Sequence, residues 1–571
     1  MDTAQVSPDT VKSRHWGWDW GWERWGLVAL LVLAWALRLP PMLDNRFHAD
    51  EALYGYWGLL IGRGRDPWLA TVPVYKPPVL PYLVAGAQAL FGNSEFAVRL
   101  PGLTAGLLTI PLAAMLSRAL YGERWAAIGA ATGLALSPFA ILFSATAFAD
   151  LPMVALGLGG CVAAARGRPG WAGVLAGLAC ATKQSGVVWL LLVALVQIAN
   201  CRSQIADRRL QIASPQIRKS ANHHSPFAIR HSPFVHSSIR RFVDSYIRHS
   251  PFAVRFVVGF LLVAGLVFAW DAVRVAQGAE SFWRMGVTGY GGLRLIWPQE
   301  LWTRLRGWIG LARYFFVSPV VNGALPVGLS LLVWNATSRH RYTRVAFVDL
   351  SLISFSLIYL LLHWLWAFPV WDRYLLPLVP VLAILLGRIL SLLASHLANR
   401  QIGKSANRQT AHSSIRRFVN SQIRHSPFVI VHCSLFILLL LPAWNAVHSR
   451  YPVGGDHGAY DGIDGVVAFL RTLPEGTVVY QHWLGWHYND YLFDAPVYLA
   501  YWPTPAWLAQ DVRAFGTRES RYIVFPSWES SARVGQALAG VGYELASVLT
   551  TTRRDGTRSF TVYHIQPFSD P

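Results

Sequence analysis

The sequence is poor in charge and in cysteine. Only 14% of its 571 residues are charged, against about 25% in an average soluble domain. Four cysteines are present and none follows Trp444, so the C-terminal region has no disulfide framework. The low charge argues against a soluble enzyme, and a hydrophobic content of 53% argues against a disordered or fibrous chain.

What the sequence does contain is a series of long apolar runs. Many of them span roughly 17–22 residues with almost no charge, the length that crosses about 30 Å of hydrocarbon. We therefore expect an α-helical polytopic membrane protein with about 11 transmembrane helices. The runs are residues 25–40, 98–117, 125–143, 150–165, 171–182, 185–200, 256–276, 316–334, 345–366, 374–394 and 428–446. The fifth and sixth, separated by Lys183-Gln184, are consistent with two helices or with one broken helix, and broken helices often line a buried site.

The net charge of +20 is concentrated in two loops. Residues 201–255 hold ten Lys and Arg against two acidic residues, and residues 396–427 hold six against none. Basic loops between apolar runs are typical of the cytoplasmic side of a membrane, so nucleic-acid binding is not expected. Both loops repeat the phrase His-Ser-Ser-Ile-Arg-Arg-Phe-Val. The repeat is consistent with a patch for anionic lipid headgroups or with low-complexity insertions.

The charges of the loops also predict an orientation. Residues 1–24 are expected to form a cytoplasmic N-terminal segment, residues 25–446 a transmembrane domain, and residues 447–571 an extracytoplasmic domain. Residues 41–97 are then the first external loop. The first apolar run is not followed by a cleavage site of small residues, so we expect it to remain as an anchor in the plasma (inner) membrane.

The C-terminal region alternates between two apolar periodicities. Residues 462–471 and 532–540 have helical spacing, whereas residues 476–481, 521–526 and 559–565 have the pattern of strands. This alternation predicts a small α/β domain.

The first external loop contains an acidic pair, Asp50 and Glu51. Two carboxylates just beyond a membrane exit can divide the work of a general base and an orienting partner. The same pair would also stabilise the N-terminus of a helix that begins near Ala52. The pair alone leaves both interpretations open.

Three cations and a third carboxylate are expected near the same, external face of the membrane. Lys76, followed by two prolines, suits a phosphate headgroup or lipid phosphates in general. Asp150 begins an apolar run, either as a site residue or as a helix cap. Arg373 suits a phosphate or an ion pair with Asp372. With Lys183 at the break between two runs, these residues are suited to transfer from a lipid phosphate, because acids remove a proton and cations hold the leaving group.

At these residues the sequence resembles the GT-C glycosyltransferases that use polyprenyl-phosphate sugars. The nearest branch is that of the protein O-mannosyltransferases and the lipid A aminoarabinose transferases. The resemblance rests on an ordered set of segments between about residues 25 and 395, which are Ala49-Asp-Glu-Ala52, Lys76-Pro-Pro78, Asn93–Pro101, Asp150, Ala181-Thr-Lys183 and Arg373–Pro377.

The resemblance implies an enzyme that moves one sugar from a polyprenyl-phosphate donor to an acceptor hydroxyl on the external face, with inversion. It implies Asp50 as the base, Lys76 as a contact of the donor phosphate and Asp150 as a second acidic site residue. We expect Glu51 to orient the acceptor or the base, and Arg373 or Lys183 to assist at the phosphate. The acceptor is left open among protein, lipid and glycan, and no cofactor is assigned, with a divalent metal left open.

Other interpretations are weaker. His482 and His487 lie five residues apart, a spacing that does not put both rings on one helix face, so no metal site is expected there. Two further functions are left open, namely a ligase or polymerase of lipid-linked oligosaccharides and a transporter or flippase of a lipid-linked or polar substrate. A transporter favours ionisable residues near the middle of spans and repeated span patterns, whereas the acids here cluster at span ends.

Overall fold

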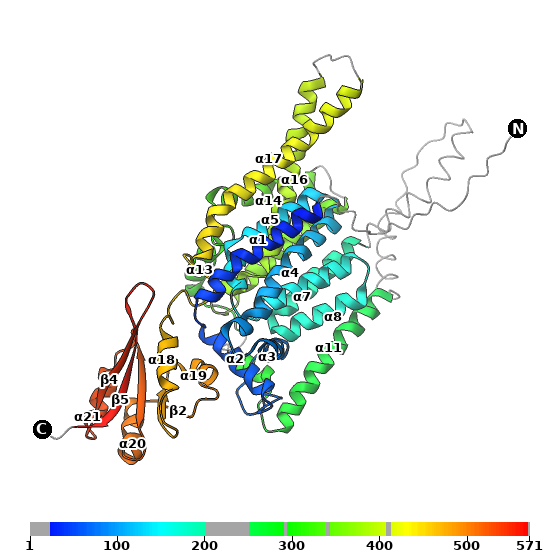
Figure 1. Ribbon diagram of the computed structural model, residues 1–571. Coiled ribbons are helices and arrows are strands. Elements are labelled where there is room, and N and C mark those ends of the chain that lie inside the picture. Colours follow the sequence, from blue (N-terminus) through cyan, green and yellow to red (C-terminus); the bar gives the residue numbers. More distant parts are fainter. Residues whose placement is uncertain (1–22, 201–250, 290–293, 339–342, 407–412, 569–571) are drawn as a thin grey trace.

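The computed structural model describes residues 23–200, 251–289, 294–338, 343–406 and 413–568. Most of the predicted N-terminal segment 1–24 and of the basic loop 201–255 therefore lies outside the described residues, as does part of the loop 396–427. The described chain forms a bundle of helices with a sheet domain at one end (Figure 1).

Seven helices of the described residues are long and apolar enough to cross a membrane, and a bent pair of helices would make an eighth span. The seven are α1 (Glu23–Asp44), α4 (Glu95–Tyr121), α11 (Pro251–Ala276), α14 (Pro319–Ser338), α15 (Arg344–Leu365), α16 (Leu378–Ala406) and α17 (Ser413–Val447). The bent pair is α5 (Arg124–Leu136) and α6 (Pro138–Ser144), which meet at 57°. Ser137 and Pro138 cause the bend, because proline cannot continue the backbone hydrogen bonds of a helix.

Three shorter apolar helices account for the remaining predicted runs. They are α7 (Asp150–Ala165), α8 (Pro169–Thr182) and the helix Gln184–Asn200. The last two are separated at Lys183, whose backbone is extended with φ −153° and ψ 137°. Each predicted apolar run thus coincides with a helix or a bent pair, and the number of eleven crossings stays a prediction.

The two expected external loops contain helices of their own. The first, residues 41–97, holds α2 (Ala49–Gly62) and α3 (Val79–Phe91), and the other, residues 277–315, which is also expected to be external, holds α12 (Phe282–Gly289) and α13 (Leu301–Ala312). Helix α2 begins three residues before the expected position at Ala52. In Figure 1, α2 and α3 lie between the bundle and the C-terminal domain, so they are placed to connect the two.

The C-terminal domain is a five-stranded mixed sheet with the strand order β2-β1-β3-β5-β4. Its strands are β1 (Val478–Gln481), β2 (Tyr498–Tyr501), β3 (Arg521–Pro526), β4 (Tyr543–Thr552) and β5 (Arg558–Pro567). Its helices are α18 (Ile463–Leu470), α19 (Gly485–Tyr491), α20 (Pro505–Phe515) and α21 (Ala532–Ala539). The predicted small α/β domain is confirmed, although the sequence analysis did not predict β2, β4, α19 or α20.

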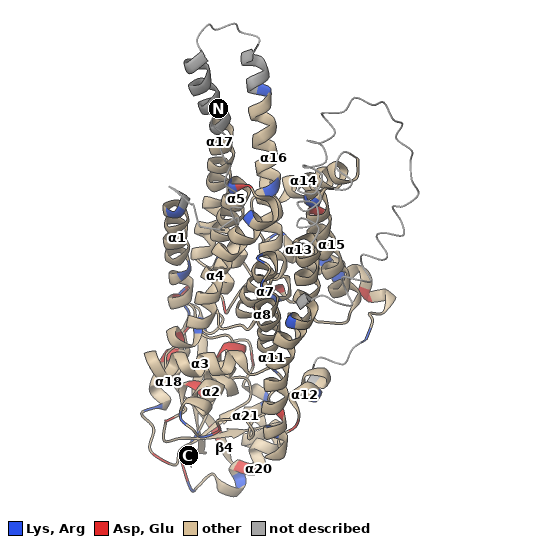
Figure 2. Ribbon diagram, turned by 90° about the vertical axis from the view of Figure 1, so that its right-hand side faces the viewer, with Lys and Arg blue, Asp and Glu red and all other residues tan. Residues whose placement is uncertain are grey.

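Helices α16 and α17 extend beyond the bundle at the end opposite the C-terminal domain, as Figure 2 shows. This hairpin carries part of the basic loop 396–427. Acidic positions are more frequent at the other end, around α2 and α18 (Figure 2). The two ends of the bundle therefore differ in charge.

Candidate functional site

The N-terminus of α2 fixes the acidic pair. The His48 side chain accepts a hydrogen bond from the backbone N–H of Asp50 (3.1 Å), and Glu51 accepts one from the backbone N–H of His48 (2.9 Å). This reciprocal arrangement is a capping box. Because consecutive residues of an α-helix point about 100° apart, the Asp50 and Glu51 side chains leave the helix in different directions.

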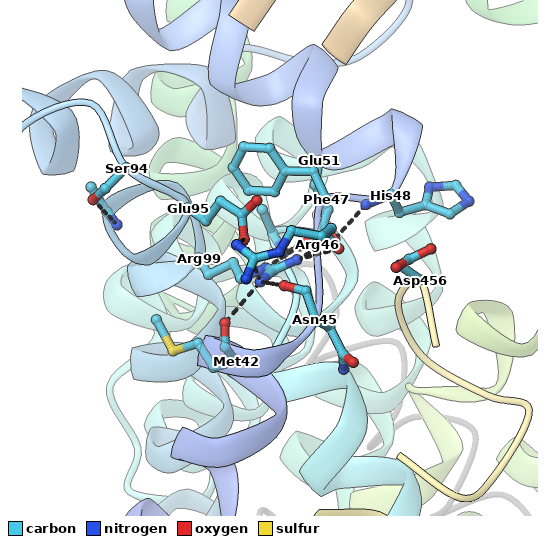
Figure 3. A network of polar contacts seen from close by, with 12 residues as sticks. Met42, Asn45, Arg46, Phe47, His48, Glu51, Ser94, Glu95, Arg99 and Asp456 are labelled. Carbon is cyan, nitrogen blue, oxygen red and sulfur yellow. Dashed lines mark hydrogen bonds and ion pairs between the residues drawn. The ribbon is translucent and has the colours of Figure 1, made fainter. Parts of the chain in front are cut away.

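Glu51 is buried in a polar network with Arg99 of α4 (Figure 3). The Glu51 Oε1 accepts from Arg99 Nε at 2.8 Å and from the backbone N–H of Ala147 at 2.9 Å, and Oε2 accepts from Arg99 Nη2 at 3.1 Å. Arg99 also donates to the backbone carbonyls of Met42 and Asn45. Glu51 therefore joins α2, α4 and the segment that leads into α7.

Close backbone packing holds that segment in place. A side chain at Gly102 of α4 would put its Cβ 2.0 Å from the carbonyl oxygen of Thr146. Glycine is therefore required at this position for α4 to approach the residues before α7. The contact fixes the start of α7, where Asp150 lies, relative to α4.

Asp50 leaves α2 in a different direction from Glu51 and forms an ion pair with Arg373. Burial alone would raise the pKa of Asp50, but the charge and hydrogen bond of Arg373 outweigh it and hold that pKa below its ordinary value. Arg373 follows Asp372, whose carboxylate accepts hydrogen bonds from the backbone N–H of Arg373 and of Gly454, each at 2.8 Å. The chain after α17 is thus attached directly beside this ion pair.

Asp150 and Lys183 form a second ion pair. The Lys183 Nζ lies 2.5 Å from Asp150 Oδ1, and both side chains are buried. Lys183 occupies the break between α8 and the helix that follows, and its Nζ lies 4.6 Å from the centre of the Tyr374 ring. The break between α8 and the following helix therefore places a cation at a buried acid.

Lys76 completes the group of charges. Burial lowers the pKa of Lys76 to about 7, and the charges of Lys183 and Arg373 add to this effect, whereas Asp150 and Asp50 oppose it. Its Nζ lies 5.1 Å from the centre of the Tyr75 ring. Five of the six predicted site residues, Asp50, Asp150, Lys76, Lys183 and Arg373, are therefore neighbours, while Glu51 is bound to Arg99.

A cavity of about 260 Å³ lies beside the cations. Its wall includes both Lys76 and Lys183 and is otherwise largely apolar and aromatic. The other lining residues are Gln184, Ser185, Val187, Trp283, Gly286, Val287, His363, Phe368 and Tyr374. A cavity with two cations at one wall and apolar side chains elsewhere suits an anionic headgroup attached to a hydrocarbon chain.

The sequence analysis missed His363 of α15, which lines this cavity. Its Nδ1 donates to the carbonyl of Tyr359 at 2.9 Å, so in the neutral ring Nε2 is the acceptor. An ionisable residue within a long apolar run is the signal that could have identified it.

The two histidines of the C-terminal domain have separate partners. His482 Nδ1 bonds the carbonyl of Trp502 at 2.8 Å, and His487 Nε2 bonds the carbonyl of Phe47 at 2.9 Å. Within the described ranges, no group of three or more His, Cys, Asp or Glu is arranged to hold a metal ion.

Comparison with known proteins matches part of the chain to a family. The model of the family described as dolichyl-phosphate-mannose-protein mannosyltransferase matches residues 75–214. The polyprenol-phosphate-mannose–protein mannosyltransferase of Mycobacterium tuberculosis is 29% identical over 219 residues, which cover 31% of this chain and 41% of that protein. The protein of the same description from Mycolicibacterium smegmatis is 28% identical over 190 residues, 28% of this chain and 36% of that protein. The matches thus span about two fifths of these relatives' length.

Solved structures show a similar fold over nearly the whole chain. The structure of ArnT from Cupriavidus metallidurans bound to undecaprenyl phosphate aligns with a TM-score of 0.56 and 14% identity, covering 95% of this chain and 98% of ArnT. Its apo structure aligns with a TM-score of 0.56 and 15% identity, covering 95% and 97%. The predicted fold, a helical GT-C membrane protein with a small C-terminal α/β domain, is confirmed, and the family match supports the resemblance to polyprenyl-phosphate-dependent glycosyltransferases.

Proposed function

We propose that this protein is a membrane glycosyltransferase that moves one sugar from a polyprenyl-phosphate donor to an acceptor hydroxyl. The observation that carries the proposal is the group formed by Asp50, Asp150, Lys76, Lys183 and Arg373 beside a largely apolar cavity. The names of the mycobacterial relatives and of the undecaprenyl-phosphate-bound ArnT support a lipid-phosphate donor.

In this proposal the donor phosphate lies against Lys76, Lys183 and Arg373, and its hydrocarbon chain extends along the apolar wall of the cavity. A lysine and an arginine can share one phosphate, the first as a compact charge and the second as a planar donor of several hydrogen bonds. Asp150 keeps Lys183 in position through their ion pair.

The reaction is a single displacement with inversion at the anomeric carbon. The acceptor oxygen bonds to that carbon as the bond from carbon to the phosphate oxygen breaks, and Asp50 takes the proton of the acceptor hydroxyl. The electron pair of the broken bond stays on the lipid phosphate, whose added negative charge the three cations stabilise. Glu51 holds the helix that carries Asp50 through its contacts with Arg99 and Ala147.

For the acceptor we propose a hydroxyl of a polypeptide, because the curated relatives are described as protein mannosyltransferases. For the location we propose the plasma (inner) membrane, with the N-terminus in the cytoplasm and the site on the external face. The frequent acidic positions near the C-terminal domain (Figure 2) and the basic residues of the sequence between 396 and 427 support this orientation.

The test uses purified protein in nanodiscs, a panel of radiolabelled polyprenyl-phosphate sugars, and serine- and threonine-bearing peptides, lipid extract or glycan as acceptors. Label transfer that requires Asp50 would support the proposal and identify the sugar and the acceptor. Saturable binding or transbilayer movement of a donor without transfer would overturn it in favour of a transporter.

A further inference from the structure

The segment between α17 and α18, residues 448–462, lies over the external side of the candidate site. We call it the connecting segment. Its Gly454 donates to Asp372 (2.8 Å), and a Cβ at Gly455 would lie 3.3 Å from Thr146 and 3.8 Å from Glu51. In Figure 3, Asp456 lies on the same side as His48. The connecting segment therefore touches residues on both sides of Asp50.

Polar contacts attach the rest of the C-terminal domain to the loop that contains Asp50. Asn45 donates to Ser449 at 2.9 Å, and Arg554 joins Asn45 (3.1 Å) to Asp461 (2.7 Å). His487 of α19 donates to the carbonyl of Phe47. These contacts bind the first external loop to three separate parts of the domain, so the domain has a defined position beside the site.

Tyr460 of the connecting segment lies beside His487, whose ring bonds the carbonyl of Phe47 in the loop that leads to Asp50. Its ring centre lies 4.3 Å from that of His487 and 5.6 Å from that of Trp528 in an edge-on contact. Within the described residues its hydroxyl has no hydrogen-bond partner. Burial raises the pKa of Tyr460, and the negative charges of Asp456 and Asp50 raise it further, which is consistent with a hydroxyl that lies near both carboxylates.

The cavity proposed for the donor does not include the exposed part of the Asp50 side chain. The Asp50 side chain is 27% exposed, yet Asp50 is not among the residues that line the cavity beside Lys76. An in-line displacement also requires the acceptor to approach the sugar from the side opposite the leaving phosphate. The C-terminal domain borders that free side, and Trp528, which is 45% exposed, extends the surface of Tyr460 into water.

We propose that the C-terminal domain forms the acceptor side of the site, where the Tyr460 hydroxyl donates a hydrogen bond to an acceptor polypeptide beside Asp50 and the Trp528 ring packs against that polypeptide. The inference rests on the proposed function. A polypeptide is favoured because the surface belongs to the sheet domain rather than to the apolar helices, and because it combines the aromatic rings of Tyr460 and Trp528 with the half-exposed guanidinium of Arg554. Tyrosine and tryptophan are enriched where proteins bind other proteins.

The experiment compares Tyr460→Phe and Trp528→Ala with Tyr498→Phe and Trp507→Ala. The two control residues are exposed aromatic residues on β2 and α20 of the same domain, 67% and 39% accessible. Each variant is assayed with a polyprenyl-phosphate sugar and a threonine-bearing peptide, and KM is measured for each substrate separately. We expect Tyr460→Phe, which keeps the ring, to raise the KM for the peptide about three- to tenfold, the value of one hydrogen bond, without changing the KM for the donor.

Equal peptide KM values in the site variants and the controls would overturn the inference while leaving the proposed function intact. Absence of transfer by the unsubstituted protein would overturn the proposed function and the inference with it. A second measurement does not depend on turnover: a photoreactive phenylalanine analogue at position 528 should crosslink to the peptide. A crosslink to added glycan or lipid alone would overturn the assignment to a polypeptide.

Discussion

Arg373 donates a hydrogen bond to Asp50 although the two residues are 323 positions apart in the chain. The residue expected to remove a proton is thus held by a residue expected to bind the donor phosphate. We propose that a donor phosphate in the site competes with Asp50 for the guanidinium of Arg373. Loss of that contact would raise the basicity of Asp50, so that one side chain would couple donor binding to activation of the base.

Asp50→Asn tests the base. An amide of the same shape cannot accept the proton of the acceptor hydroxyl, so we expect kcat to fall by about 100- to 10,000-fold while donor binding is retained. Transfer of radiolabel and binding of the donor are measured on the same preparation. Asp44→Asn, at an exposed carboxylate of the same external loop, is the control and should behave as the unsubstituted protein. Normal turnover of Asp50→Asn would remove Asp50 as the base.

Arg373→Gln tests the coupling through pH. Arg373 lowers the pKa of Asp50 against the effect of burial, so its removal leaves burial dominant and raises that pKa. A general base works only when deprotonated, and its activity therefore falls as pH drops below its pKa. We expect the acidic limb of the profile of kcat/KM against pH to move upward by about one unit or more. An acidic limb that does not move would show that Arg373 does not set the pKa of the catalytic base.

Lys76 predicts a second pH dependence. Its pKa is lowered to about 7, first by burial and then by Lys183 and Arg373, so above this pH the empty site loses one positive charge. The donor is a phosphodiester whose charge is constant in this range. Donor affinity should therefore weaken as pH rises above 7, by up to about tenfold per unit, because binding requires uptake of one proton. Lys76→Arg should abolish this dependence, since arginine stays protonated. Binding isotherms of the donor, measured from neutral to alkaline pH for the unsubstituted protein and for Lys76→Arg, test this dependence.

The sequence predicted the helical runs, because apolar length is a property of local sequence. The side of the membrane that each loop faces, which follows from the charges of the loops, stays a prediction. It did not predict which charges pair. The resemblance distinguished Asp50 as the base from Glu51, but it did not show that Glu51 is buried against Arg99. The residue that caps α2 is His48, which lies outside the usual Ser/Thr pattern of a capping box. The pairing of Asp50 with Arg373 depends on packing across the whole bundle. Strand β2, at the sheet edge, was missed because none of its four residues is buried, so it has no alternation of buried apolar and exposed residues.

Glu51→Ala tests the structural role of the second acid. Removing one partner of a buried ion pair leaves the other charge uncompensated, so we expect a loss of about 3–5 kcal/mol in the free energy of unfolding. Glu280→Ala is the matched control, because Glu280 pairs with Arg284 on the surface, where both side chains are exposed, and such pairs contribute about 1 kcal/mol or less. Unfolding is followed in detergent with increasing denaturant. Loss of turnover at unchanged stability would instead give Glu51 a direct part in the reaction.

Gly286→Leu tests whether the cavity holds the donor. Gly286 of α12 lines the cavity, and a Cβ there would lie 3.1 Å from Gln184 Nε2 and 3.4 Å from the carbonyl oxygen of Tyr75. A leucine side chain must therefore displace Gln184 or occupy part of the cavity beside Lys76. Gly265→Leu is the control, because a Cβ at Gly265 in α11 meets no atom within 4 Å. We expect Gly286→Leu to weaken binding of a polyprenyl-phosphate sugar about tenfold or more, the effect of overpacking a filled site by about 1–3 kcal/mol, and Gly265→Leu to leave it unchanged. Equal affinity in both variants would place the donor elsewhere on the protein.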